Sequence, residues 1–115
     1  MVDENLLKEL RERMVNQFLD LLILLFLNKP NSPETASNMF KLCKDMFGVE
    51  IDSDSMYRLL LVLEKKGLIQ GSNKEVTEKR IKRFYKLTDE GRELVEKFLE
   101  AHEEMINFTK FIFTS

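Results

Sequence analysis

Six basic side chains within one short segment have the clearest chemical potential in this sequence. Residues 74–86 contain Lys74, Lys79, Arg80, Lys82, Arg83 and Lys86 but only two acidic residues, whereas the whole chain has a net charge of −2. Lysine and arginine side chains neutralise phosphate groups and donate hydrogen bonds to their oxygens. The segment therefore predicts contact with a polyanion, although a charge run of this kind also occurs on a merely solvated surface.

Residues that could support catalysis or hold a metal are not brought together by the sequence. Its one cysteine and one histidine, Cys43 and His102, are distant from each other in the chain. No nucleophile, base and orienting group occur together, and no glycine-rich phosphate loop is present. We expect Cys43 to be a buried small hydrophobe and His102 a polar interruption of a helix face. The sequence thus predicts no enzyme activity, no cofactor and no metal.

Length and composition favour one soluble globular domain. The chain has 115 residues, of which 43% are hydrophobic and 33% charged. A single cysteine fits a reducing, cytoplasmic setting, and the N-terminus is acidic where a secretory signal would be basic. The longest apolar run, residues 21–27, is far shorter than the roughly 20 residues of a membrane-spanning helix. We therefore expect a cytoplasmic protein without a membrane segment.

Helical spacing of apolar residues organises most of the chain. Residues 3–27 read as one long helix, followed by a loop at 28–32. A second helix is expected to begin with Ser32 as its cap and Pro33 in its first turn, and to end at Gly48. A third begins within residues 52–55, with Ser53 or a neighbour as its cap, and ends at Gly67.

The remaining elements complete a recognisable order. Residues 68–72 and 81–87 read as a β-hairpin with a long polar tip at 73–80, and a last helix begins at 88–90 and reaches residue 107 or beyond. This order predicts a mainly α fold with a small β-hairpin wing: a winged helix-turn-helix with N- and C-terminal dimerisation helices. Residues 1–88 would form the DNA-binding part and residues 89–115 the dimerisation helix of one compact unit.

Three motifs resemble the PadR-like family of transcriptional regulators. Residues 56–69, MYRLLLVLEKKGLI, are similar to its recognition helix and the start of its wing, and residues 83–92, RFYKLTDEGR, to the second wing strand and the start of its dimerisation helix. Residues 20–27 are similar to its first core helix. The resemblance covers roughly residues 13–105. It implies a homodimer that binds double-stranded DNA and can respond to a small-molecule effector, which the sequence leaves unknown.

The DNA-binding candidates lie on two elements. The third helix can present its N-terminal polar residues to a major groove, and a projecting basic ribbon can contact phosphates or a minor groove. The candidates are Ser53, Ser55, Tyr57 and Arg58 on the helix, and Lys74, Lys79, Arg80, Lys82 and Arg83 on the wing. Alternatively, the serines only cap the helix and Tyr57 packs at the core edge. Phe84 and Tyr85 are expected to pack inward.

A domain of this size cannot cover the whole apolar stripe of its last helix, so a partner helix is the expected cover. The predicted dimer interface comprises Leu6, Leu10, Met14, Leu94, Val95, Phe98, Leu99, Met105 and Ile106. The alternative is that the last helix folds back on the first.

Together these features predict a dimeric, sequence-specific DNA-binding transcriptional regulator, a repressor whose operator half-sites are about one helical turn apart. The alternative is a winged-helix protein-protein interaction module without DNA binding. Leu61 and Val62 favour that alternative, because PadR-like chains often have basic residues at these positions.

Overall fold

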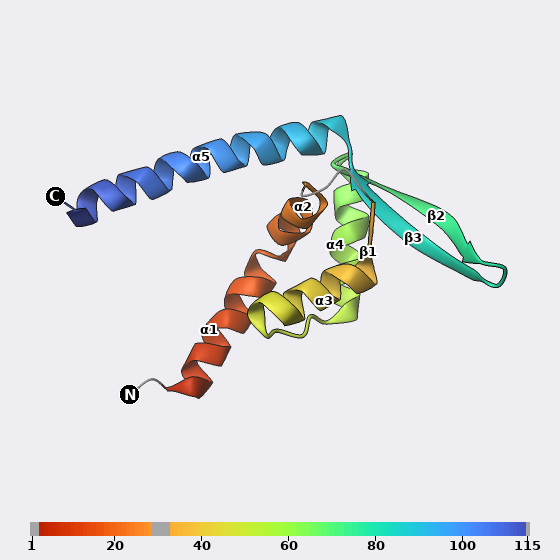
Figure 1. Cartoon of the computed structure of the whole chain (residues 1–115), viewed down its shortest axis with the longest axis horizontal. Coiled ribbons are helices and arrows are strands. Elements are labelled where there is room, and N and C mark those ends of the chain that lie inside the picture. The colour runs from red at the N-terminus through yellow and green to blue at the C-terminus, as the bar shows by residue number, and fades with distance from the viewer. Residues whose placement is uncertain (1–2, 29–32, 115) are drawn as a thin grey trace.

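The computed structural model describes residues 3–28 and 33–114, and the side chains of residues 105–106 and 108–114 lie outside what it describes. Along the chain the elements follow the order of three N-terminal helices interrupted by a short strand, a fourth helix, a hairpin and a long last helix (Figure 1). They are α1 (Glu4–Gln17), α2 (Leu19–Asn28), β1 (Glu34–Thr35), α3 (Ala36–Phe47), α4 (Ser53–Lys65), β2 (Ile69–Thr77), β3 (Arg80–Leu87) and α5 (Asp89–Thr114).

The first helical segment is divided in two, so the prediction of one continuous helix over residues 3–27 was wrong. Phe18 leaves helical geometry with φ −108° and ψ 21°, yet its N–H still donates to the carbonyl of Met14. The result is a bend and not a loop. It turns the apolar α2 into the core, where Leu19 and Ile23 are fully buried, while α1 projects away (Figure 1).

The start of α3 also differs from the prediction. The expected cap, Ser32, lies outside the described residues, and Pro33 precedes the helix instead of opening it. Glu34 and Thr35 pair with Tyr85 and Phe84 of β3 in antiparallel register. Thr35 then caps α3, its Oγ1 accepting from the backbone N–H of Asn38 at 3.2 Å. A long-range strand pairing therefore overrides the local Ser-Pro signal.

The predicted boundaries of the later helices are confirmed. Asp52, a neighbour of Ser53, caps α4 by accepting from the N–H of Ser55 at 3.0 Å. Gly67 follows the helix with a φ of 75°, a left-handed conformation that glycine adopts without a Cβ penalty. Thr88 caps α5, its Oγ1 accepting from the N–H of Gly91 at 3.1 Å and donating to the carbonyl of Gly67 at 2.6 Å. The same threonine thus ties the start of α5 to the end of α4.

The wing is a longer and more regular hairpin than the sequence indicated. Strand pairing continues from Ile69 opposite Leu87 to Thr77 opposite Arg80, with an irregularity between Glu75 and Thr77, so most of the predicted polar tip is strand. The three-stranded sheet has the order β1-β3-β2. Figure 1 shows the hairpin projecting well beyond the helices.

One core joins the helices to the base of the wing. Its buried side chains come from all five helices of the described chain and from β2 and β3, and they include Val15, Ile23, Met39, Met56, Leu60, Ile69, Tyr85 and Val95. Tyr85 packs inward as expected, while Phe84 is half-buried. The described part of α5 packs against α2, which is the second half of the predicted first helix, whereas α1 and α5 diverge in Figure 1. None of the helices in the described ranges has the length and apolar composition needed to cross a membrane.

Candidate nucleic-acid interface

The exposed face of α4 carries the four helix candidates in different environments. Ser53 and Arg58 are exposed, and Tyr57 is 53% exposed with its ring edge-on to Phe40, 6.3 Å between centroids. Ser55 is different, because its hydroxyl donates to the capping carboxylate of Asp52 at 3.1 Å. The structure therefore leaves Ser53, Tyr57 and Arg58 at the surface and gives Ser55 a part in the helix cap.

Strand register divides the basic wing residues between two faces. Residues directly opposite in an antiparallel pair lie on the same face. Lys74 is opposite Lys82, and Gln70 is opposite Lys86, which places three lysines on the outer face of the hairpin. Arg83, opposite Asn73, belongs to the other face, which looks toward α4. Lysines therefore dominate the outer face.

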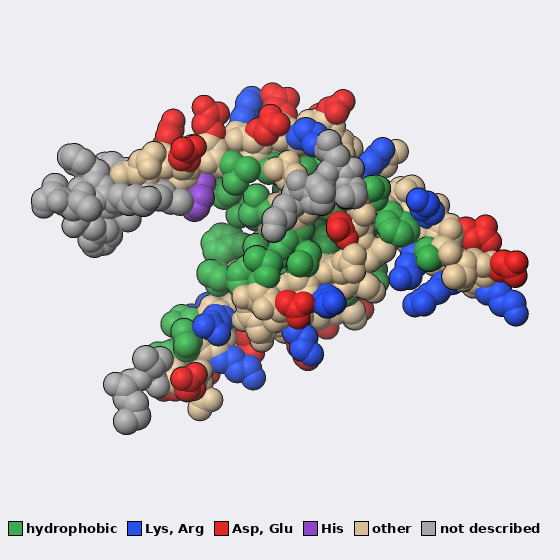
Figure 2. Space-filling model, in the orientation of Figure 1, with side chains coloured by type: hydrophobic (Ala, Val, Ile, Leu, Met, Phe, Trp, Pro, Cys, Tyr) green, Lys and Arg blue, Asp and Glu red, His purple; other side chains and the backbone are tan. Residues whose placement is uncertain are grey.

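The pairing of Lys74 with Lys82 is unfavourable within the protein itself. Like charges directly opposite each other destabilise a sheet. Neither lysine forms an ion pair with an acidic side chain of the described chain, and Lys79 and Arg80 at the tip also form none. Lys74 instead lies 6.0 Å from the ring centroid of Phe84. Figure 2 shows several Lys and Arg side chains along the lower edge and tip of the ribbon. This arrangement is suited to an external anion.

Arg83 is bound to the protein's own acidic residue. Its guanidinium donates to both carboxylate oxygens of Glu64 on α4, at 3.2 and 3.0 Å, and to the side-chain oxygen of Asn73 at 3.2 Å. It also lies 5.6 Å from the ring centroid of Tyr85. The hydrogen bond to Glu64 raises the pKa of Arg83. Burial raises the pKa of Tyr85, and the nearby guanidinium opposes that shift.

A cleft joins the two predicted DNA-binding elements. It has a volume of about 350 Å³ and is lined by the start of α3, by Tyr57 of α4, and by β3 from Arg80 to Arg83. The first backbone N–H groups of a helix have no partner within the helix, and they mark the positive end of its dipole. Thr35 satisfies one of them, that of Asn38. The cleft therefore combines basic side chains with a helix N-terminus, an environment that favours phosphate. Sequence reasoning missed the α3 contribution, because only the fold brings α3 beside the wing.

Exposed apolar side chains form two stripes away from the wing. One follows α1 through Leu6, Leu10, Met14 and Phe18, and the other comprises Leu94, Phe98 and Leu99 on α5. Figure 2 shows hydrophobic side chains gathered along the sides of α1 and α5 that face each other. Val95 is a correction to the predicted interface, because it is 1% exposed and belongs to the core of the single chain. The side chains of Met105 and Ile106 lie outside the described residues.

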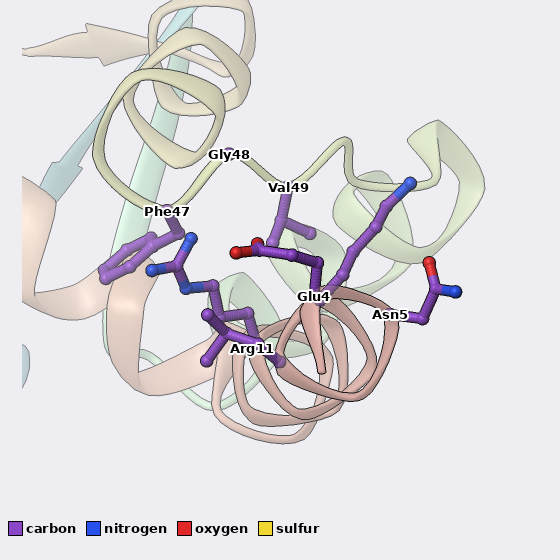
Figure 3. A pocket seen from close by; sticks show the side chains of 8 residues that line it. Glu4, Asn5, Arg11, Phe47, Gly48 and Val49 are labelled. Carbon is purple, nitrogen blue, oxygen red and sulfur yellow. The ribbon is translucent and has the colours of Figure 1, made fainter. Parts of the chain in front are cut away.

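A further cleft of about 350 Å³ lies between the start of α1 and the end of α3. Figure 3 shows the guanidinium of Arg11 pointing toward Phe47 at the end of α3, while the carboxylate of Glu4 points toward Val49. A cation near a helix C-terminus interacts favourably with the helix dipole. We therefore assign Arg11 to packing between α1 and α3.

The described residues show no gathering of three or more His, Cys, Asp or Glu side chains that could hold a metal ion. His102 stacks on Phe98, with 5.9 Å between the ring centroids. Cys43 is fully buried, and burial raises the pKa of its thiol. His102 therefore contacts an aromatic ring of its own helix, and Cys43 is part of the apolar core.

Residues 23–97 match the model of the family described as "Transcriptional regulator PadR-like family". No curated protein matches the chain in sequence.

Solved structures share its fold. A PadR-like transcriptional regulator from Bacillus cereus superposes with a TM-score of 0.73 at 20% identity, covering 90% of this chain and 98% of that one. A PadR family regulator from Eggerthella lenta gives 0.71 at 18% identity, covering 95% and 93%. PadR of Bacillus subtilis, solved in complex with operator DNA, gives 0.62 at 23% identity, covering 70% of this chain and 46% of that one.

Proposed function

Because this chain belongs to the PadR-like family of transcriptional regulators, a family of regulators and not of enzymes, we propose that it represses transcription by binding operator DNA as a homodimer. Residues 1–88 would supply the DNA contacts and residues 89–115 the dimerisation helix. The Bacillus subtilis relative, which was solved with its operator, supports the choice of DNA as the ligand. The cytoplasmic location expected from the sequence belongs to the same proposal, since a regulator must share a compartment with DNA.

The observation that carries the proposal is the lysine pair on the outer face of the wing. Lys74 and Lys82 are held opposite each other without an acidic partner in the described chain. Such a pair costs stability in the free protein and is relieved when phosphates approach. Tyr57 of α4 lines the same cleft as β3, and Arg58 is exposed on the same helix, so both can reach base edges or phosphates.

Fluorescence anisotropy with a labelled duplex taken from upstream of the protein's own gene tests this proposal. We expect saturable binding that weakens steeply as salt is raised, because phosphate neutralisation releases counterions. A scrambled duplex of the same length should bind more weakly. Binding that is absent at low salt would contradict the proposal.

The dimer is supported by the two exposed apolar stripes and by an apolar cleft that adjoins the α5 stripe at Leu99. A cleft of about 580 Å³ is lined mainly by apolar side chains of α2 and α3 and by Leu99 of α5. A second copy, related by a two-fold axis, would bury its own stripes against these. Sedimentation equilibrium should therefore give twice the chain mass for the wild type. Leu94→Glu should give the monomer mass, whereas Glu96→Gln on the polar side of α5 should remain dimeric. A monomeric wild type would refute this part.

A protein-binding module remains a second candidate function on one specific observation. Leu61, 53% exposed, and Val62 lie on the same outward face of α4 as Arg58. Replacing both with Gln should leave DNA affinity within about twofold if this face meets DNA through its other residues, since surface changes have small effects. The protein-binding function would be favoured if the double variant lost binding to a protein partner while neither the wild type nor the variant bound DNA measurably.

A further inference from the structure

Arg83 belongs to a cluster that joins the wing to α4. Its guanidinium is held by the carboxylate of Glu64, the side chain of Asn73 and the ring of Tyr85. We name these four residues, with Gly71, the wing clasp. Glu64 lies 19 residues before Arg83 in the sequence, so the contact connects β3 of the wing with α4.

Gly71 gives the clasp its space. A Cβ atom at this position would lie 2.7 Å from both Nε and Nη2 of Arg83, closer than real Cβ atoms come to other atoms. The guanidinium therefore packs directly on the backbone of β2. Its planar shape and several donors suit a fixed, multiply bonded position, in contrast to the lysines of the outer face.

We propose that Arg83 is a positioning residue that fixes the angle of the wing over α4 and makes no contact with DNA. The inference rests on the proposed function and divides the basic wing residues into two groups. Lys74, Lys79, Arg80 and Lys82 meet phosphate, whereas Arg83 is neutralised by Glu64 and keeps those four at a set distance from Tyr57 and Arg58. The wing and the helix then reach the duplex as one rigid surface, and little ordering is needed on binding.

Three single substitutions break the clasp by different means. Glu64→Ala removes the acceptor, Arg83→Ala removes the donor, and Gly71→Ala displaces the guanidinium without changing any charge. Glu78→Ala is the matched control for Glu64→Ala, because it removes the same charge from the exposed turn of the wing. Gln70→Ala is the control for Gly71→Ala, one residue earlier in the same strand and on the opposite face.

Amide hydrogen exchange of the free protein tests the clasp without DNA. In all three clasp variants we expect the amides of β2 and β3 to exchange about three- to tenfold faster, with the helices unchanged and both controls like the wild type. Unchanged exchange in the three clasp variants would overturn the proposal. Hydrogen exchange shows whether the clasp holds the wing on α4 even if the wild type binds no DNA. In that case only the proposed function fails.

DNA affinity then separates positioning from direct contact. If Arg83 positions the wing, Glu64→Ala binds about threefold or more weakly than Glu78→Ala, and the double variant Glu64→Ala/Arg83→Ala is no weaker than Arg83→Ala alone. Gly71→Ala should weaken binding while keeping the wild-type salt slope. The proposal is overturned if Glu64→Ala binds as tightly as Glu78→Ala while Arg83→Ala reduces the magnitude of the salt slope by about 1.8, the value for two lost phosphate contacts, one in each subunit of the dimer.

Discussion

Replacing Lys82 with glutamine should stabilise the free protein while weakening its binding to DNA. Lys82 is directly opposite Lys74 in the hairpin, and both amines lack an acidic partner in the described chain. Glutamine keeps most of the half-buried methylene stem and removes the charge. Cross-strand pairs contribute roughly 0.2–1 kcal/mol, so relief of this repulsion should raise the free energy of unfolding by an amount in that range.

Urea denaturation at low salt measures the stability change. The midpoint for Lys82→Gln should exceed that of the wild type, and the difference should shrink at high salt because screening weakens the repulsion. Lys79→Gln is the matched control, since Lys79 lies in the turn and has no cross-strand lysine. It should leave the midpoint unchanged. A midpoint for Lys82→Gln at or below the wild-type value would refute the repulsion argument.

The DNA part of the same prediction uses the slope of log affinity against log salt. One phosphate contact contributes about 0.9 to this slope, and the homodimer has two copies of Lys82, so the two lost contacts change the slope by about 1.8, which corresponds to about thirtyfold in affinity at 0.15 M salt. Lys82→Gln should lose this amount for all duplex sequences, because phosphate contacts carry no sequence information. An unchanged slope would show that Lys82 does not meet phosphate.

Three further predictions concern stability and reactivity. Gly91→Ala should cost about 2 kcal/mol of stability in urea denaturation, because its Cβ would collide with the carbonyl oxygen of Leu68. The control Glu93→Ala in the same helix should change the stability little, and equal urea midpoints for the two variants would be evidence against the collision. Asp52→Ala should lower the free energy of unfolding by about 1 kcal/mol because it removes the α4 cap, whereas Asp52→Asn, which can still accept the hydrogen bond, should be close to the wild type. An equal loss of stability in the two variants would mean that the cap is not the cause. Cys43 should react slowly with a thiol reagent at pH 8 and rapidly in urea, since burial raises its pKa; fast reaction of the native protein would contradict its burial.

Local chemistry was sufficient to predict most of the helices. A threonine followed by two acidic residues indicated the start of α5, and glycines at 48 and 67 indicated the ends of α3 and α4, because caps depend on near neighbours in sequence. The start of α3 could not be predicted in this way, since it depends on pairing of Glu34 and Thr35 with β3, about fifty residues later. The bend at Phe18 has no proline or glycine to indicate it.

The candidate interface was predictable in composition but not in detail. Clustering of basic residues in one segment identified the wing, yet their division between two faces required the strand register, because weak alternation of residue types left it open. Nothing local to Arg83 indicates its partner, since Glu64 and Gly71 come to it from other elements. Val95 was assigned to the dimer stripe by helical spacing alone, whereas the way α5 packs on α2 puts it in the core.

The salt dependence of wild-type binding to a duplex from its own upstream region tests the central claim most directly. Four wing residues per chain, Lys74, Lys79, Arg80 and Lys82, have no acidic partner in the described structure, so a dimer offers eight such groups. At about 0.9 per phosphate contact, full engagement would give a slope of about −7, and engagement of half of them about −4. A slope between these values is the predicted result. A slope near zero, or no binding at low salt, would contradict the account.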